Sequence, residues 1–123
     1  MKILIADDNR HILNIIKDSL ENLDIEIDTA LNGEEALYLM RSNEGAYNLL
    51  ITDINMDDMT GVELAKKSRE IDPDIKIIGI SGSRTLGMVS KDIKEEDRKL
   101  FDKFLFKPFS IYDLRAMVNG LLV

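Results

Sequence analysis

The chain has 123 residues, of which 45% are hydrophobic and 32% charged, a balance typical of one folded domain with its own core. The net charge of −7 argues against direct binding to nucleic acid, and no apolar stretch is long enough to span a bilayer. The absence of cysteine excludes disulfides and thiolate metal sites. No signal-peptide pattern follows Met1, so we expect a cytoplasmic protein.

Short apolar runs alternate with helix-like stretches along the chain. Several of the runs are continuous blocks of Ile and Leu, as expected for strands covered on both faces. The predicted strands are Lys2–Ala6, Ile25–Leu31, Asn48–Thr52, Ile75–Ile80 and Lys103–Phe106.

Helices are predicted between these strands from apolar residues at helical spacing. The first runs from Ile12 to Leu23, and three more are Glu34–Arg41, Val62–Ile71 and Ile111–Leu122. In the fourth connection the best helical candidate is Lys91–Phe101. Five strand–helix repeats predict an α/β fold, a flavodoxin-like, doubly wound, five-stranded parallel sheet with five helices, in a single domain.

Polar side chains follow the predicted strands at their carboxyl ends, the edge where ligands bind in open α/β sheets. Asp7 and Asp8 follow the first strand, Asp53 the third, Ser81 the fourth and Lys107 the fifth. Each residue alone has an ordinary explanation as a helix cap, a turn residue or a surface lysine. Their joint placement at one edge is more specific.

Three carboxylates at one edge need neutralisation. Two carboxylates ~4 Å apart repel by roughly 4 kcal/mol at an effective dielectric of about 20. Lys107 offsets part of this repulsion, and a divalent cation can offset the rest. Mg²⁺ suits such oxygen ligands, whereas zinc would need His or Cys, and His11 in the first predicted helix has no partner and is interpreted as structural or surface. We therefore predict a Mg²⁺ site made by Asp7 or Asp8, Asp53 and a nearby backbone carbonyl.

The same groups can accept a phosphoryl group, because such transfers depend on positioning and charge neutralisation. Asp53 can act as the nucleophile and become an aspartyl phosphate. Ser81 and Lys107 can contact the remaining phosphoryl oxygens, and Gly82 leaves room beside them. These residues predict a phosphorylation-switched signalling domain centred on Asp53.

The order and spacing of the motifs resemble the receiver domain of bacterial response regulators over essentially the whole chain. The matching residues are Asp7-Asp8, Asp53-x-x-Met56, Gly61, Ser81-Gly82 and Lys107-Pro108-Phe109. The resemblance implies that residues 1–123 form one receiver domain of a two-component system, of the chemotaxis-type single-domain kind. Its partners would be a histidine kinase or phosphotransfer protein, and an effector that docks on the face of the fourth helix, fifth strand and fifth helix.

The resemblance also implies roles for individual residues. Asp7, Asp8, Asp53 and the backbone carbonyl of Asn55 would form the metal site. Phe104 matches the aromatic switch position, three residues before the lysine of the motif, Lys107. Such a domain assists its own phosphorylation and dephosphorylation and is not an enzyme acting on an external substrate.

Ser81 and Lys107, by the same resemblance, would couple phosphorylation to conformation. The spacing of these two residues departs from the family pattern, because 26 positions separate them, a few more than is usual. This predicts an enlarged loop or helix between the fourth and fifth strands.

Two further positions depart from the family pattern. Asp57, followed by Asp58, stands where the family usually has a proline and adds negative charge beside the site. Phe104 stands where tyrosine is common, so it has no hydroxyl to donate.

The sequence leaves three other functions to compare with this one. A flavin or nucleotide module is disfavoured, because Asp7-Asp8-Asn9 is the wrong charge for a phosphate and no Gly-x-Gly-x-x-Gly occurs. A Mg²⁺-dependent phosphohydrolase using an aspartyl phosphate would want a second acid two positions after Asp53, where Asn55 stands. A receiver-like interaction module that is never phosphorylated is kept open by Asp57.

Overall fold

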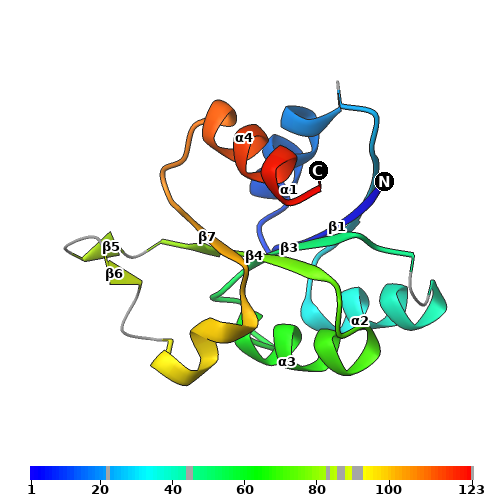
Figure 1. Ribbon diagram of the computed structural model, residues 1–123, viewed down its shortest axis with the longest axis vertical. Helices are drawn as coiled ribbons and strands as arrows, with labels where there is room; N and C mark the ends of the chain where they lie inside the picture. Colours follow the sequence, from blue (N-terminus) through cyan, green and yellow to red (C-terminus); the bar gives the residue numbers. More distant parts are fainter. Residues whose placement is uncertain (22, 44–45, 83, 86–87, 90–92, 123) are drawn as a thin grey trace.

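The computed structural model describes residues 1–21, 23–43, 46–82, 84–85, 88–89 and 93–122. Strands and helices alternate along most of this chain, as Figure 1 shows. The strands are β1 (Lys2–Ala6), β2 (Glu26–Ala30), β3 (Leu49–Asp53), β4 (Lys76–Ser81), β5 (Arg84–Thr85), β6 (Met88–Val89) and β7 (Lys103–Phe106). The helices are α1 (Arg10–Leu20), α2 (Gly33–Ser42), α3 (Gly61–Ile71), the 3₁₀ helix η1 (Glu95–Leu100) and α4 (Ile111–Leu122).

The main sheet has five parallel strands in the order β2-β1-β3-β4-β7. In Figure 1, α1 and α4 cover one face of this sheet, and α2, α3 and η1 cover the other. The predicted flavodoxin-like fold with five helices is confirmed, with a 3₁₀ helix as the fourth of them. No helix within the described ranges is long and apolar enough to cross a membrane.

The central strand β3 is buried along its whole length. Leu49 and Ile51 pack toward α1 and α4, while Leu50 packs toward α2 and α3. The last residue of the strand is Asp53, one position beyond the predicted end at Thr52. The sheet therefore carries a carboxylate to the end of its most buried strand.

The first helix begins at Arg10, because Asn9 caps it. The Asn9 side chain accepts hydrogen bonds from the backbone N–H groups of His11 and Ile12. Asn9, and not Asp8, therefore caps this helix. His11 lies exposed on this helix, as one of its two interpretations expected.

The connection between β4 and β7 differs most from the prediction. β5 and β6 form a small antiparallel hairpin, and the predicted helix Lys91–Phe101 is reduced to the 3₁₀ helix η1. Residues 91 and 92 lie outside the described part of the chain. The predicted α-helix is absent from the described residues of this segment because the run from Lys94 to Lys99 is entirely charged. It leaves no apolar stripe to pack an α-helix against the sheet. The expected enlargement of this connection is thus a hairpin followed by a 3₁₀ turn.

Arg69, on α3, fixes the position of η1. Its guanidinium donates hydrogen bonds to the carbonyl oxygen of Leu100, with Nη2 at 2.7 Å, and to the carbonyls of Pro73 and Ile75. It also pairs with Asp102, whose Oδ2 accepts the N–H of Ile77 on β4 at 2.8 Å. The end of η1 is therefore tied to α3 and β4 by one side chain.

Candidate functional site

Three carboxylates meet at the carboxyl ends of β1 and β3. These strands are neighbours, with Ala6 opposite Thr52, so Asp7 and Asp53 continue the pairing side by side. One carboxylate oxygen from each of Asp7, Asp8 and Asp53 lies within 4.8 Å of the others. Asp7 is 0% exposed and Asp53 6% exposed, whereas Asp8 faces solvent. The acidic cluster predicted from the strand ends is therefore present in the fold.

Each of these carboxylates accepts a hydrogen bond from a backbone N–H. Asn9 donates to Oδ1 of Asp7 at 2.8 Å, and Asn55 donates to Oδ1 of Asp53 at 3.1 Å. The N–H of Asp57 donates to Oδ2 of Asp8 at 3.3 Å. The backbone thus fixes the orientation of all three acids and offsets part of their mutual repulsion.

The environment of Asp7 is unfavourable for a negative charge. Burial, and to a lesser extent the neighbouring charges of Asp53 and Asp8, raise the pKa of Asp7 to about 6, against the lowering effects of the Asn9 N–H and Lys107. Its Oδ2 is buried and has no hydrogen-bond partner among the described residues.

An oxygen of this kind is suited to bind a cation. The donor set around it consists of carboxylate oxygens alone, which is the ligand chemistry that Mg²⁺ prefers. The cluster of Asp7, Asp8 and Asp53 therefore fits a hard divalent cation. Asn55 contributes its N–H to Asp53 and is otherwise exposed beside the cluster.

Lys107 brings the one positive charge that contacts this cluster in the described part of the chain. Its Nζ lies 3.4 Å from Oδ2 of Asp53. Its backbone N–H donates to the carbonyl of Ser81 at 2.8 Å, which extends the β4–β7 pairing past the last strand residue. The next peptide bond, to Pro108, is cis. Backbone pairing with β4 thus delivers the lysine to Asp53.

Ser81 and Gly82 end β4 beside this contact. Ser81 is fully buried and lies one position beyond Ile80, the residue paired with Asp53. Gly82 is exposed, and a Cβ at this position would meet no atom of the described residues within 4 Å. That Gly82 leaves room beside a phosphoryl group on Asp53 stays a prediction.

Phe104 lies farther along β7, packed on the α3 side of the sheet. Its ring is 4.9 Å from that of Phe101, with the planes tilted by 41°. Phe101 and Ile54 both lie over Gly79, where a Cβ would come within 2.9 Å of the Phe101 ring and 2.8 Å of the Ile54 side chain. The predicted switch aromatic is thus connected by packing to the residue that follows Asp53.

Two features of the site escaped prediction. Gly61 was expected only as a motif match, yet its Cα faces the backbone of Asp53 and Ile54 so closely that a Cβ would overlap the Asp53 carbonyl oxygen. Its glycine identity at the start of a predicted helix was the available signal. The hydrogen bond from Asp57 to Asp8 had no signal, because every residue except proline has a backbone N–H.

Comparison with known proteins points to one family. The model of the response regulator receiver domain matches residues 3–119. The chain is 33% identical to the response regulator receiver protein CpdR of Brucella abortus, over 99% of this chain and 97% of that protein. It is also 32% identical to the transcriptional regulator NtrC of Azospirillum brasilense, but there it spans only 24% of the relative.

Solved structures agree with these relatives. A receiver domain protein from Clostridium thermocellum superposes with a TM-score of 0.86 at 27% identity, covering 98% of this chain and 93% of that one. TrrA of Thermotoga maritima, solved in complex with Mg²⁺-BeF, superposes with a TM-score of 0.83 at 34% identity, covering 98% and 97%. The fold, the acidic strand-end cluster and these matches lead to one conclusion: the chain belongs to the response regulator receiver domain family.

Proposed function

We propose that this chain is a phosphorylation-controlled signalling switch in which Asp53 accepts a phosphoryl group from a histidine kinase or phosphotransfer protein. The observation that carries the proposal is the carboxylate of Asp53, placed at the end of a buried strand within 4.8 Å of two more acids and 3.4 Å from Lys107. Relatives include the hybrid signal transduction histidine kinase L of Dictyostelium discoideum and the sensor protein EvgS of Escherichia coli, in which the matched part is 7% and 10% of the protein. We further propose that residues 1–123 act as one receiver domain in the cytoplasm.

The transfer itself needs little covalent machinery. An oxygen of the Asp53 carboxylate forms a bond to phosphorus while the bond from phosphorus to the donor's histidine nitrogen breaks, and the imidazole leaves with that electron pair. Asp7, Asp8, Asp53 and the carbonyl of Asn55 would hold Mg²⁺, which when bound neutralises charge on the phosphoryl oxygens. Two observations support this ligand set: the Oδ2 of Asp7 is buried without a partner among the described residues, and TrrA was solved in complex with Mg²⁺-BeF.

Lys107 and Ser81 would contact the phosphoryl oxygens that the metal leaves available. Lys107 now pairs with Oδ2 of Asp53 at 3.4 Å, and a phosphoryl group on Asp53 would offer it a stronger partner. Ser81 ends the neighbouring strand, and the open space at Gly82 leaves room for the new group. The same contacts would assist dephosphorylation, so the domain controls the lifetime of its own signal without being an enzyme for external substrates.

Signalling would follow as a population shift between two packings of Phe104. This ring packs on Phe101, which shares its position over Gly79 with Ile54, the residue after the phosphoacceptor. A change at Asp53 would therefore reach Phe104 through side chains of one hydrophobic cluster. An effector would sense the shift through β7, because this strand carries Phe104 and ends directly before Lys107.

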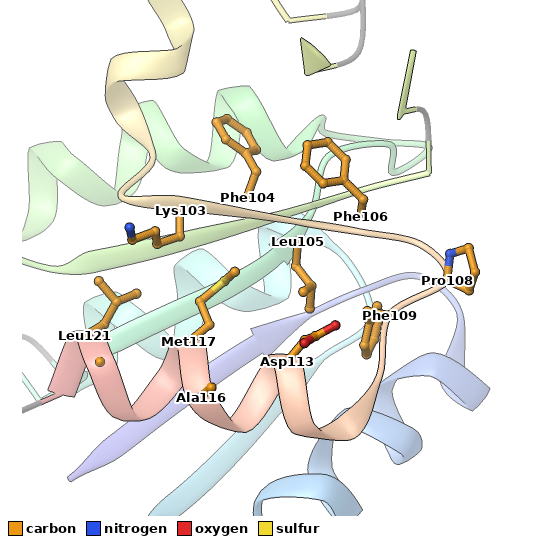
Figure 2. A pocket seen from close by; sticks show the side chains of 11 residues that line it. Lys103, Phe104, Leu105, Phe106, Pro108, Phe109, Asp113, Ala116, Met117 and Leu121 are labelled. Carbon is orange, nitrogen blue, oxygen red and sulfur yellow. The ribbon is translucent and has the colours of Figure 1, made fainter. Parts of the chain in front are cut away.

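The output surface we propose lies on β7 and α4, where an effector protein would dock. A groove of about 650 Å³ runs between these elements and is lined in part by Leu105, Phe109, Met117 and Leu121 (Figure 2). Figure 2 shows Phe104 and Leu105 on opposite sides of β7. Repacking of Phe104 would thus alter the strand that forms one wall of the groove.

The proposal is tested by intact-mass measurement after incubation with Mg²⁺ and a small acyl phosphate. The mass should rise by one phosphoryl group in the wild type and in Asp58→Ala, a matched control that removes an exposed acid five positions along. Asp53→Ala should show no increase. An unchanged wild-type mass, or an equal increase in Asp53→Ala, would show that Asp53 is not the phosphoacceptor.

A further inference from the structure

The loop after β1 and the loop after β3 are joined by one hydrogen bond at the acidic cluster. The backbone N–H of Asp57 donates to Oδ2 of Asp8 at 3.3 Å, across 49 positions of sequence. The corresponding bonds to the other two acids are local, since Asn9 and Asn55 each donate to an aspartate only two positions earlier. The orientation of Asp8 alone depends on a different loop.

Asp8 is also the acid that most needs an external constraint. Asp7 and Asp53 are buried and cannot swing away, whereas Asp8 is exposed and is repelled by both of them. Among the described residues, the Asp57 N–H is the hydrogen-bond donor to its carboxylate. Even so, an oxygen of Asp8 lies within 4.8 Å of oxygens of the other two acids.

We infer that Asp57 is a positioning residue for the cation site, acting through its backbone N–H and not through its carboxylate. The hydrogen bond keeps Asp8 turned toward Asp7 and Asp53 before a cation binds, so less ordering of the side chain is required on binding. Hydrogen bonds to ligating carboxylates typically contribute 10- to 100-fold to metal affinity. This inference rests on the Mg²⁺ site of the proposed function and adds a residue outside the ligand set.

Two substitutions at one position separate the N–H from the carboxylate. Asp57→Ala and Asp57→Pro both remove the negative charge, but only proline removes the N–H. By calorimetric titration of the phosphate-free protein, we expect the Kd for Mg²⁺ to be about 10-fold higher in Asp57→Pro than in Asp57→Ala, the lower end of the range because this bond is long and exposed. Equal Kd values in the two variants would overturn the role of Asp57.

A second measurement tests the hydrogen bond without a proline in the chain. In the metal-free protein, Asp8→Ala should move the amide proton resonance of Asp57 upfield. The control Asp18→Ala, at an exposed position of α1, should leave that resonance in place. An unchanged Asp57 resonance in Asp8→Ala would also overturn the inference. If the wild type itself binds no Mg²⁺, both the metal site of the proposed function and the role of Asp57 fail. If the wild type binds Mg²⁺ but the two Asp57 variants have equal Kd values, only the role of Asp57 fails.

Discussion

The sheet carries charged groups at both of its ends, and the two ends treat them differently. Near the start of β1, the Nζ of Lys2 lies 3.6 Å from Oδ2 of Asp28 and 5.2 Å from the ring of Tyr47. The Tyr47 hydroxyl donates to the same Asp28 oxygen at 2.6 Å. One cation, one anion and one hydroxyl are therefore matched within the protein.

At the carboxyl ends of the strands the charges do not balance. Three carboxylates face one lysine, and one buried oxygen of Asp7 lacks a partner among the described residues. Folding a chain around such a cluster costs stability unless something outside the chain completes it. Unmatched charge, and not charge as such, therefore distinguishes the end of the sheet at which we propose the phosphorylation site.

The largest effect on this comparison is expected from Gly61→Ala. The new Cβ would overlap the Asp53 carbonyl oxygen and approach Cα of Ile54 to 2.8 Å, so the backbone that carries the proposed phosphoacceptor must move. We expect a loss of about 3 kcal/mol in the free energy of unfolding, measured by urea denaturation, together with slower phosphorylation.

The matched control for that substitution is Gly120→Ala on α4. A Cβ there meets no atom of the described residues within 4 Å, and alanine favours a helix, so stability should rise by up to roughly 1 kcal/mol. Similar losses in the two variants would mean that close packing at Gly61 does not hold the acidic end of the sheet.

A smaller effect of opposite sign is expected from Asp7→Asn. This change removes a buried charge that two other acids repel, and asparagine can still accept the N–H of Asn9. In the absence of Mg²⁺ the variant should be more stable than the wild type by about 2 kcal/mol in urea denaturation. It should also lose Mg²⁺ binding. A variant less stable than the wild type would contradict the conclusion that the buried charge of Asp7 destabilises this end of the sheet.

The pH dependence of stability should show the same strain. The pKa of Asp7 is about 6 in the folded protein and 3.8 ordinarily, so the folded state binds the proton more tightly. Protonation therefore favours folding, and the contribution of Asp7 to stability should increase, on the order of 1 kcal/mol, as pH falls from about 7 to about 5. Urea titrations at both pH values should show this gain in the metal-free wild type relative to Asp7→Asn.

Saturating Mg²⁺ should reverse that trend, because metal binding needs the ionised carboxylate. A wild type and an Asp7→Asn variant that respond alike to pH would show that the titrating group lies elsewhere.

The smallest effect is expected at the balanced end. Lys2→Met removes a pair whose partners are 24% and 38% exposed, so the loss of stability should stay below about 1 kcal/mol. Its Kd for Mg²⁺ should equal that of the wild type in calorimetric titration. A large change in Kd would mean that the two ends of the sheet are coupled.

The strands and the acidic cluster could be predicted from the sequence for a common reason. A parallel strand covered on both faces reads as a block of Ile and Leu, and the residue after each block lies at the same edge of the sheet. Asp7, Asp8, Asp53 and Lys107 followed from that rule, and β3 lies one position later than predicted, from Leu49 to Asp53 instead of from Asn48 to Thr52. The fold and the placement of these side chains can thus be predicted from short segments of the sequence, each taken by itself.

The parts that could not be predicted depend on tertiary contacts between backbones. The contact from Asp57 to Asp8 uses an N–H that nearly every residue has, and only the approach of two loops makes it specific. The charged run in η1 has no apolar periodicity, so its sequence does not indicate where it packs. Its position is set by a hydrogen bond from Arg69 on another helix. Sequence patterns describe how a segment packs and not which distant carbonyl it meets.

The guanidinium of Arg69 also has a consequence for how this connection can vary. It anchors the end of η1 to α3 and β4 from the far side, through the carbonyl of Leu100 and the carboxylate of Asp102. The entry into β7 is therefore fixed independently of how many residues precede η1. We therefore expect that insertions between β4 and η1 would cost little in the register of Lys107 with Asp53, so that a peptide could be grafted into this connection.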